Sequence, residues 1–310
     1  AVQVETRLDA QGGIETVWME ARGDTHRGRP RAGTNRAGPA RLAANAARDC
    51  DIPRFVPEPN MNRHAGLHRN LDPVYSFDDK RMVKALVPDL PLRPSALRCL
   101  GATANVFAIE CMMDELAARA GADPISYRIA HLEDPRAQAV LVALRDRLAA
   151  APRLSDGHGR GIAYAQYKNA MTRVAVAVDL IVTDQGRVQL EHVRLVADAG
   201  RIVDPDGLRA QLEGGMLQGA SWALHEKVQW AHDGRETLDW DSYPVLRFDN
   251  IPVVETTLMT PEDDRARGAG EASPPPTVAA IANGIYAATG LRLRRMPFDA
   301  EAVIQAALQV

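Results

Sequence analysis

The sequence predicts an α+β fold, in which mixed and antiparallel sheets pack against helices. Two observations point to this class. Apolar residues recur at helical spacing between residues 103 and 150, where no strand-like alternation occurs. From about residue 160 to residue 310, some segments have alternating apolar residues and others have helical spacing. Hairpins together with segregated helices are typical of the α+β class.

The composition is that of an ordinary globular chain. Its 310 residues are 46% hydrophobic and 25% charged, which excludes collagen-like, coiled-coil and wholly disordered classes. The net charge of −3 gives no overall field that would recruit nucleic acid or an acidic membrane. No apolar run approaches the ~20 residues of a membrane-spanning helix. The three cysteines form no Cys-x-x-Cys pair, which favours neither a disulfide scaffold nor a structural zinc site.

The first 22 residues are typical of a β-hairpin. Val2, Val4 and Thr6 alternate with polar residues, a glycine-containing turn follows, and residues 14–20 return. Because the chain starts at Ala1 within what reads as a strand, we expect residues 1–22 to continue an upstream domain.

Residues 23–97 are predicted to be an irregular connection rich in arginine and proline. Six arginines between Arg27 and Arg48 lie among Gly, Pro and Ala. They suit either a polyanion or partner site or a solvated connection, and the lack of interleaved aromatic residues favours the connection over a nucleic-acid site. His64 and His68 have the spacing of two ligands on a helix, but Gly66 lies between them and no zincin carboxylate accompanies them, so we expect loop histidines rather than a metal site.

The segment that follows is predicted to hold three helices and then a hairpin. The first helix covers 104–120, and two further helices begin at the Asp-Pro pairs Asp123-Pro124 and Asp134-Pro135. Alternating apolar residues at 174–182 and 188–196, joined by a turn, predict an antiparallel hairpin. The remaining expected elements are a helix over 205–224, strand pieces at 227–230 and 253–259, a helix over 277–289, a strand at 291–294 and a short helix after Asp299.

Three short motifs are candidates for chemistry. The sequence Gly268-Ala269-Gly270-Glu271 precedes a helix, and its glycines allow a bulky group to approach the backbone beside a carboxylate. Gln211 or Gln218 could offer an amide to a ligand beside Gly214-Gly215, and Arg98 could orient an anionic or carbonyl-bearing substrate. Taken singly, the motifs are better explained by a structural turn, close helix packing and a salt bridge, respectively.

The order of the motifs along the chain adds information that single motifs lack. They are Arg98-x-x-Gly101, Asn105-x-Phe107-Ala108-x-Glu110, Asp114-Glu115-Leu116-Ala117, Asp123-Pro124, Asp198-x-Gly200, Pro205, Gln211-x-Glu213-Gly214-Gly215, Gly268-x-Gly270-Glu271, Ala279-Ala280-Ile281-Ala282-Asn283, Gly290-x-Arg292 and Pro297. This series resembles the molybdopterin-binding large subunit of the xanthine dehydrogenase/aldehyde oxidoreductase family, in the branch of isoquinoline 1-oxidoreductase beta subunits and nicotinate dehydrogenase large subunits. The resemblance runs from about Tyr75 to the C-terminus, and weakly over residues 1–22.

The resemblance implies a fold, an activity and residue roles. Residues 98–310 would form the C-terminal half of a molybdenum-cofactor-binding domain that holds molybdopterin in its cytosine dinucleotide form. The enzyme would be a bacterial hydroxylase that oxidises an N-heteroaromatic or aldehyde substrate with water as the oxygen source. Glu271 would be the general base and Arg98 would orient the substrate. Gln211, Gly214, Gly215 and Gly270 would bind the cofactor, and no residue here would ligate the metal directly.

The resemblance also implies partners. The chain has no iron–sulfur or haem cysteine pattern, so electrons would pass to a separate [2Fe–2S] small subunit and, in some relatives, to a cytochrome. The family's Gly-Gly-Gly-Phe-Gly and Glu-Met-Gly-Gln-Gly loops are not in this sequence. We expect them in a missing upstream half of the cofactor domain, without which this chain would be inactive.

Two departures from the family pattern keep an alternative open. Asp204 stands where Asn is usual, and Pro274-Pro275-Pro276 replaces a Gly-Pro pair. The alternative is a non-catalytic scaffold or partner-binding remnant of the same family, without molybdenum. The sequence assigns no cellular location and no specific substrate.

Overall fold

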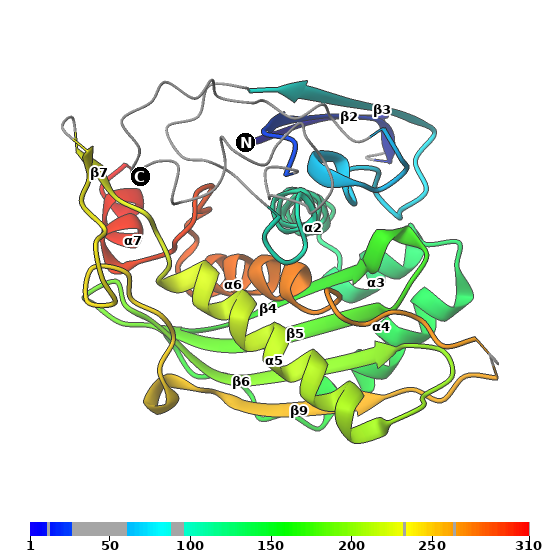
Figure 1. Cartoon of the computed structure of the whole chain (residues 1–310). Coiled ribbons are helices and arrows are strands. Elements are labelled where there is room, and N and C mark those ends of the chain that lie inside the picture. Colours follow the sequence, from blue (N-terminus) through cyan, green and yellow to red (C-terminus); the bar gives the residue numbers. More distant parts are fainter. Residues whose placement is uncertain (11–12, 27–60, 88–95, 232–233, 263–264, 310) are drawn as a thin grey trace, which may run out of the picture. The chain divides into compact units, whose positions relative to one another are not determined.

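The computed structural model describes residues 1–10, 13–26, 61–87, 96–231, 234–262 and 265–309 (Figure 1). The chain divides into two compact units. The N-terminal unit comprises Ala1–Pro73 and Phe77–Asn105, and the C-terminal unit comprises Val74–Ser76 and Val106–Val310. The arginines from Arg27 to Arg48 lie outside the described residues.

The N-terminal unit contains a three-stranded sheet in the order β1-β2-β3. Strands β1 (Val2–Leu8) and β2 (Ile14–Gly23) form an antiparallel hairpin, and β3 (Asp79–Leu86) pairs with β2 in parallel. Within the predicted irregular connection of residues 23–97, β3 is a regular strand of eight residues. Parallel pairing with a strand more than fifty residues earlier supplies its backbone hydrogen bonds, and no local pattern reveals such pairing.

A four-stranded sheet in the order β4-β5-β6-β9 organises the C-terminal unit. Strands β4 (His158–Gln166), β5 (Arg173–Val182) and β6 (Val188–Asp198) are antiparallel neighbours, and β9 (Val253–Leu258) joins β6 in parallel. The predicted antiparallel hairpin is confirmed as β5 and β6.

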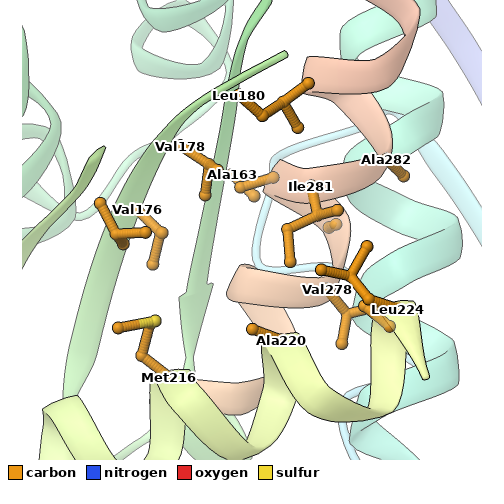
Figure 2. Close-up of a cluster of buried hydrophobic side chains, with 14 of the residues drawn as sticks. Ala163, Val176, Val178, Leu180, Met216, Ala220, Leu224, Val278, Ile281 and Ala282 are labelled. Atoms are coloured by element: carbon orange, nitrogen blue, oxygen red, sulfur yellow. The ribbon is translucent and has the colours of Figure 1, made fainter. Parts of the chain in front are cut away.

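Helices cover both faces of this sheet, which is why β5 is buried along most of its length. Helices α5 (Pro205–Leu224) and α6 (Pro274–Thr289) pack on one face, and α4 (Pro135–Ala149) packs behind β5 and β6 (Figure 1). Figure 2 shows the first of these interfaces. Apolar residues from three elements meet there, namely Val176, Val178, Leu180, Met216, Ala220, Leu224, Val278, Ile281 and Ala282.

Local signals place the remaining helices. They are α2 (Ala102–Arg119), whose first turn belongs to the N-terminal unit, α3 (Pro124–Ala130) and α7 (Ala300–Ala307). Aspartates accept a backbone N–H at four helix starts, namely Asp123, Asp134, Asp204 and Asp299, and proline follows the first three of them. Short pieces complete the fold, namely 3-10 turns η2 (Gly66–His68), η3 (Tyr167–Asn169) and η4 (Phe248–Asn250), and the two-stranded β7 (Trp230–Ala231) and β8 (Gly234–Arg235).

The strand expected at 291–294 does not form. Its alternation comes from Arg292 and Arg294, which reach the α2 carboxylates of Asp114 and Glu115 instead of facing a neighbouring strand. In the part of the chain that the structure describes, no helix has the length and apolar character needed to cross a bilayer.

Candidate functional site

The loop that carries Glu271 is fixed at both of its ends. Ser273, which is fully buried, begins α6, and its hydroxyl donates to the Leu212 carbonyl of α5 at 2.7 Å. On the other side, the Arg267 N–H donates to the Ala199 carbonyl at the end of β6 at 2.8 Å. Glu271 lies between these anchors with a half-buried side chain. The backbone of the loop that carries Glu271 is therefore held by a hydrogen bond on each side.

Close packing between α5 and the start of α6 brings a glutamine to this loop. A Cβ at Gly219 would lie 2.8 Å from the Pro274 carbonyl oxygen, so only glycine permits the approach. Near the start of α5, the Gln211 side-chain amide then donates to the Gly270 carbonyl at 3.1 Å. Gln218, the other candidate, is half-buried two turns further along the helix.

Three of the predicted cofactor residues are exposed on α5 and the loop beside it. Gln211, Gly214 and Gly270 are all exposed, and a Cβ built at Gly214 or Gly270 would meet no atom within 4 Å. Gly215 differs, because it is buried together with the core residues of α5. The structure thus brings Gln211, Gly270 and Glu271 together and leaves room beside two of the glycines.

A tyrosine that the sequence analysis did not identify also belongs to this site. Tyr167 follows β4 in η3, and its hydroxyl donates to Oε2 of Glu271. Its ring is part of the buried hydrophobic cluster. The two residues are 104 positions apart, so no local pattern could have paired them.

One cationic side chain lies close to the tyrosine, and a second bonds to the turn that follows it. The Lys168 ammonium is 5.2 Å from the centroid of the Tyr167 ring, a distance at which a cation is attracted to the ring face. The Arg267 guanidinium donates to the Ala170 carbonyl at 3.1 Å. The arrangement of a half-buried carboxylate, a phenol donor and nearby cations can hold and accept a proton beside a polar ligand.

Asp198 in the Asp198-x-Gly200 motif has an architectural role. Its carboxylate accepts two hydrogen bonds from Arg136, at 2.7 and 2.6 Å, and a third from the Gly200 N–H at 2.9 Å. Burial raises the pKa of Asp198, but the hydrogen bonds from Arg136 and Gly200 outweigh burial and the pKa is lowered overall. The motif thus ties the end of β6 to the start of α4.

Arg98 belongs to the N-terminal unit, whereas Gln211, Gly270 and Glu271 belong to the C-terminal unit. It occupies a turn in which Cys99 and Leu100 have left-handed backbone angles, with φ of 74° and 53°. A Cβ at Gly101 would lie 2.1 Å from the Leu67 carbonyl oxygen, so the turn requires this glycine. The role of Arg98 beside a substrate stays a prediction.

The residues fit a cofactor held by amide and main-chain groups better than a metal held directly by side chains. Among the described ranges, no group of three or more His, Cys, Asp and Glu could hold a metal ion. His68 is engaged elsewhere, with Nε2 2.8 Å from the Asn62 carbonyl and Nδ1 3.3 Å from the Lys84 ammonium. An exposed glutamine amide beside two open glycine positions suits the polar edge of a flat ring system such as a pterin.

Comparison with known proteins connects this geometry to a family. Residues 102–252 match the molybdopterin cofactor-binding domain. Over 247 residues the chain is 34% identical to the B subunit of nicotinate dehydrogenase from Pseudomonas putida, a match that covers 74% of this chain and 21% of that protein. Over 220 residues it is 32% identical to the beta subunit of isoquinoline 1-oxidoreductase from Brevundimonas diminuta, covering 69% and 28%. The chain therefore spans less than a third of the length of these relatives.

Solved structures share the fold. The aldehyde oxidoreductase of Desulfovibrio gigas aligns with a TM-score of 0.76 at 14% identity, over 100% of this chain and 49% of that one. Quinoline 2-oxidoreductase of Pseudomonas putida 86 aligns with a TM-score of 0.74 at 11% identity, over 99% and 62%. These likenesses confirm the predicted α+β class.

Proposed function

Because this chain belongs to the molybdopterin-binding proteins of the xanthine dehydrogenase/aldehyde oxidoreductase family, we propose that it is part of a molybdenum hydroxylase-type oxidoreductase. The observation that carries the proposal is the meeting of Gln211, Gly270 and Glu271 on α5 and the loop before α6. The proposed cofactor-binding region covers residues 98–310, and the proposed cofactor is molybdopterin in its cytosine dinucleotide form. The proposed substrates are N-heteroaromatic compounds or aldehydes, as the names of the relatives suggest.

The positions of the residues on α5 and on the loop before α6 support their proposed roles, and the role of Arg98 is proposed from the resemblance to the family. The bound molybdenum would supply two-electron oxidation with an oxygen atom that derives from water. Gln211 and the main chain of Gly270 hold the pterin edge, and the absence of a side chain at Gly214 leaves space for it. Glu271 accepts a proton on its carboxylate, and Arg98 orients the substrate and stabilises developing negative charge.

Further parts of the enzyme are proposed with this function. Electrons would leave through a [2Fe–2S] small subunit and, in some forms of the enzyme, through a cytochrome. The family loops that this sequence lacks would complete the cofactor site from another part of the protein.

The decisive experiment replaces Glu271 by glutamine in the assembled enzyme. With nicotinate, isoquinoline or a simple aldehyde as the probe, turnover should fall by about 10²- to 10⁴-fold, which is the usual contribution of a general base. Molybdenum content should stay at the wild-type level. Glu301→Gln, at an exposed position of α7, is the matched control and should keep full turnover. An unchanged rate in Glu271→Gln would remove this residue from its role.

The alternative of a non-catalytic remnant rested partly on Asp204, and this residue has a structural explanation. Its carboxylate accepts the Gly207 N–H at 3.1 Å and caps the start of α5. The charge therefore serves the helix on which Gln211 lies. Metal analysis of the protein isolated from its native host tests the alternative, because a molybdenum-free preparation that retains its partner subunits would contradict the enzymatic proposal.

A further inference from the structure

We propose that Tyr167 is a positioning residue that holds the carboxylate of Glu271 for proton transfer. The inference rests on the proposed function, because it assigns a task to a neighbour of the proposed base. The hydroxyl of Tyr167 donates to Oε2 of Glu271, so one oxygen of the carboxylate has a fixed direction.

Tyr167 is itself firmly held, which is what a positioning residue requires. Only 9% of its surface is exposed, and its ring packs within the core cluster of the C-terminal unit. Its N–H donates to the Thr172 carbonyl at 2.9 Å, and its carbonyl accepts the Met171 N–H at 2.9 Å. A glutamate side chain has three rotatable bonds, so a donor on a rigid ring restricts its carboxylate far more than solvent would.

The backbone turns directly after Tyr167. Lys168 and Asn169 adopt left-handed angles, with φ of 53° and 52°, which asparagine adopts readily and lysine seldom does. The turn that results is linked to the glutamate loop, since the Thr172 N–H donates to the Gly268 carbonyl at 3.4 Å. Tyrosine and glutamate therefore approach each other from two connected turns.

Phenylalanine at position 167 separates positioning from packing. Tyr167→Phe keeps the buried ring and removes only the hydroxyl. A residue that serves packing alone would leave the reaction unchanged after this substitution. A positioning residue would lower kcat and leave KM close to its wild-type value, because the effect falls on the chemical step and not on substrate binding.

The first measurement tests the contact without using catalysis. Tyrosine labelled with ¹³C at the ring Cζ is incorporated into the full protein, and the Tyr167 signal is identified by its loss in Tyr167→Phe. Glu271→Gln should displace this signal, because the acceptor changes from a carboxylate to an amide. Glu226→Gln should leave it in place, since Glu226 accepts from Tyr243 at 2.9 Å and not from Tyr167. A Tyr167 signal that does not shift in Glu271→Gln overturns the proposal.

The second measurement is steady-state kinetics of the assembled enzyme. We expect kcat to fall about tenfold in Tyr167→Phe, the size expected when one hydrogen bond to a charged group is lost, with KM nearly unchanged. Tyr243→Phe removes the hydroxyl of a comparable tyrosine–glutamate pair and should keep the wild-type kcat.

The outcomes distinguish the two proposals. A displaced signal with unchanged kcat overturns the positioning role and leaves the proposed function intact. If Glu271→Gln itself keeps full turnover, the role of Glu271 as the base fails and the positioning role fails with it, while the hydrogen bond still shows in the spectrum.

Discussion

Two glutamates of the motif series, Glu110 and Glu271, occupy opposite environments within the C-terminal unit. Glu110, on α2, is fully buried and accepts hydrogen bonds from the Tyr75 hydroxyl at 2.6 Å, from Arg128 at 2.8 Å and from the Tyr164 N–H at 2.8 Å. Glu271 is half-buried on a loop next to exposed glycines. The same side chain thus serves as a structural tie in one place and is available to a ligand in the other.

The buried glutamate is part of a closed network. Arg128, also fully buried, donates to the Glu110 carbonyl at 2.9 Å and to the Pro124 carbonyl at 3.0 Å as well as to the carboxylate. Burial first, and then the charge of Glu110, raise the pKa of the Tyr75 hydroxyl well above its usual value, so it remains a donor. Presence in a family motif does not separate the two roles. Burial and the set of partners do.

The largest expected effect comes from breaking the buried pair. Arg128→Met leaves the Glu110 charge without its guanidinium partner, and the free energy of unfolding should fall by about 3–5 kcal/mol. Urea titration followed by circular dichroism measures this loss. The double variant Arg128→Met/Glu110→Gln should recover part of the stability, because no unpaired charge then remains buried and the glutamine oxygen can still accept from the Tyr75 hydroxyl. A single variant as stable as the wild type would show that the network does not tie the unit together.

For Glu271, the more exposed of the two glutamates, we expect a small effect on stability and a large effect on turnover. Glu271→Gln should change the free energy of unfolding by less than about 1 kcal/mol, because the glutamine oxygen can still accept from the Tyr167 hydroxyl, although we expect turnover to fall strongly. A loss of stability close to that of Arg128→Met would mean that Glu271 is also a structural tie.

What could be predicted from sequence followed from local signals. The Asp-Pro pairs located the starts of α3, α4 and α5, because a capping aspartate and a proline in the first turn act within a few residues. The β5–β6 hairpin was equally accessible, because its two strands are adjacent in sequence. Motif order identified the family. It also singled out Gln211 and Glu271, whose roles stay predictions, and the fold brings Gln211 on α5 into contact with the loop that carries Glu271.

What could not be predicted depends on distant partners. The contact between Tyr167 and Glu271 spans 104 positions, and β3 pairs with a strand that precedes a long connection. Arg292 and Arg294 alternate with apolar residues as in a strand, but their side chains bind acidic residues on α2 and the segment is not a strand. Gly215 follows Gly214 in the same motif, yet helical geometry turns it into the core.

Two glycines, one buried and one exposed, should differ in how an added methyl group changes the free energy of unfolding. A Cβ at Gly161 of β4 would lie 1.9 Å from the Ala280 carbonyl oxygen and 2.1 Å from the Gly284 nitrogen of α6. Gly161→Ala should therefore lower the free energy of unfolding by about 3 kcal/mol, the upper part of the range for overpacking. Gly214→Ala should instead raise it by about 0.5–1 kcal/mol, because alanine favours the helix and meets no atom.

Molybdenum analysis of Gly214→Ala separates the effect on stability from the effect on cofactor binding. If Gly214 leaves space for the cofactor, Gly214→Ala should lower molybdenum content in spite of its higher stability. Full metal loading of a stabilised Gly214→Ala protein would remove Gly214 from the cofactor site.

The smallest effect concerns acid stability, and it again sets a buried carboxylate against an exposed one. Asp179 on β5 is buried and accepts hydrogen bonds at 2.8 Å from both Arg160 and Arg194. Burial raises the pKa of Asp179, but these hydrogen bonds and the two positive charges outweigh it, so the pKa lies below its usual value. A carboxyl group with a lowered pKa in the folded state stabilises the protein above the pKa of the unfolded chain, and this contribution disappears as the pH falls through the folded-state value.

The contribution of Asp179 to the free energy of unfolding should therefore stay level from neutral pH to about pH 5 and decline below about pH 4, where unfolded aspartates bind protons. Asp179→Asn should be less stable at neutral pH and should show a shallower decline across that range. Asp146→Asn, at an exposed position of α4, should keep the wild-type slope. If Asp179→Asn declined as steeply as the wild type, the acid sensitivity would have to arise outside the Arg160–Asp179–Arg194 cluster, and the buried ion pairs of the sheet would not set the pH range of the fold.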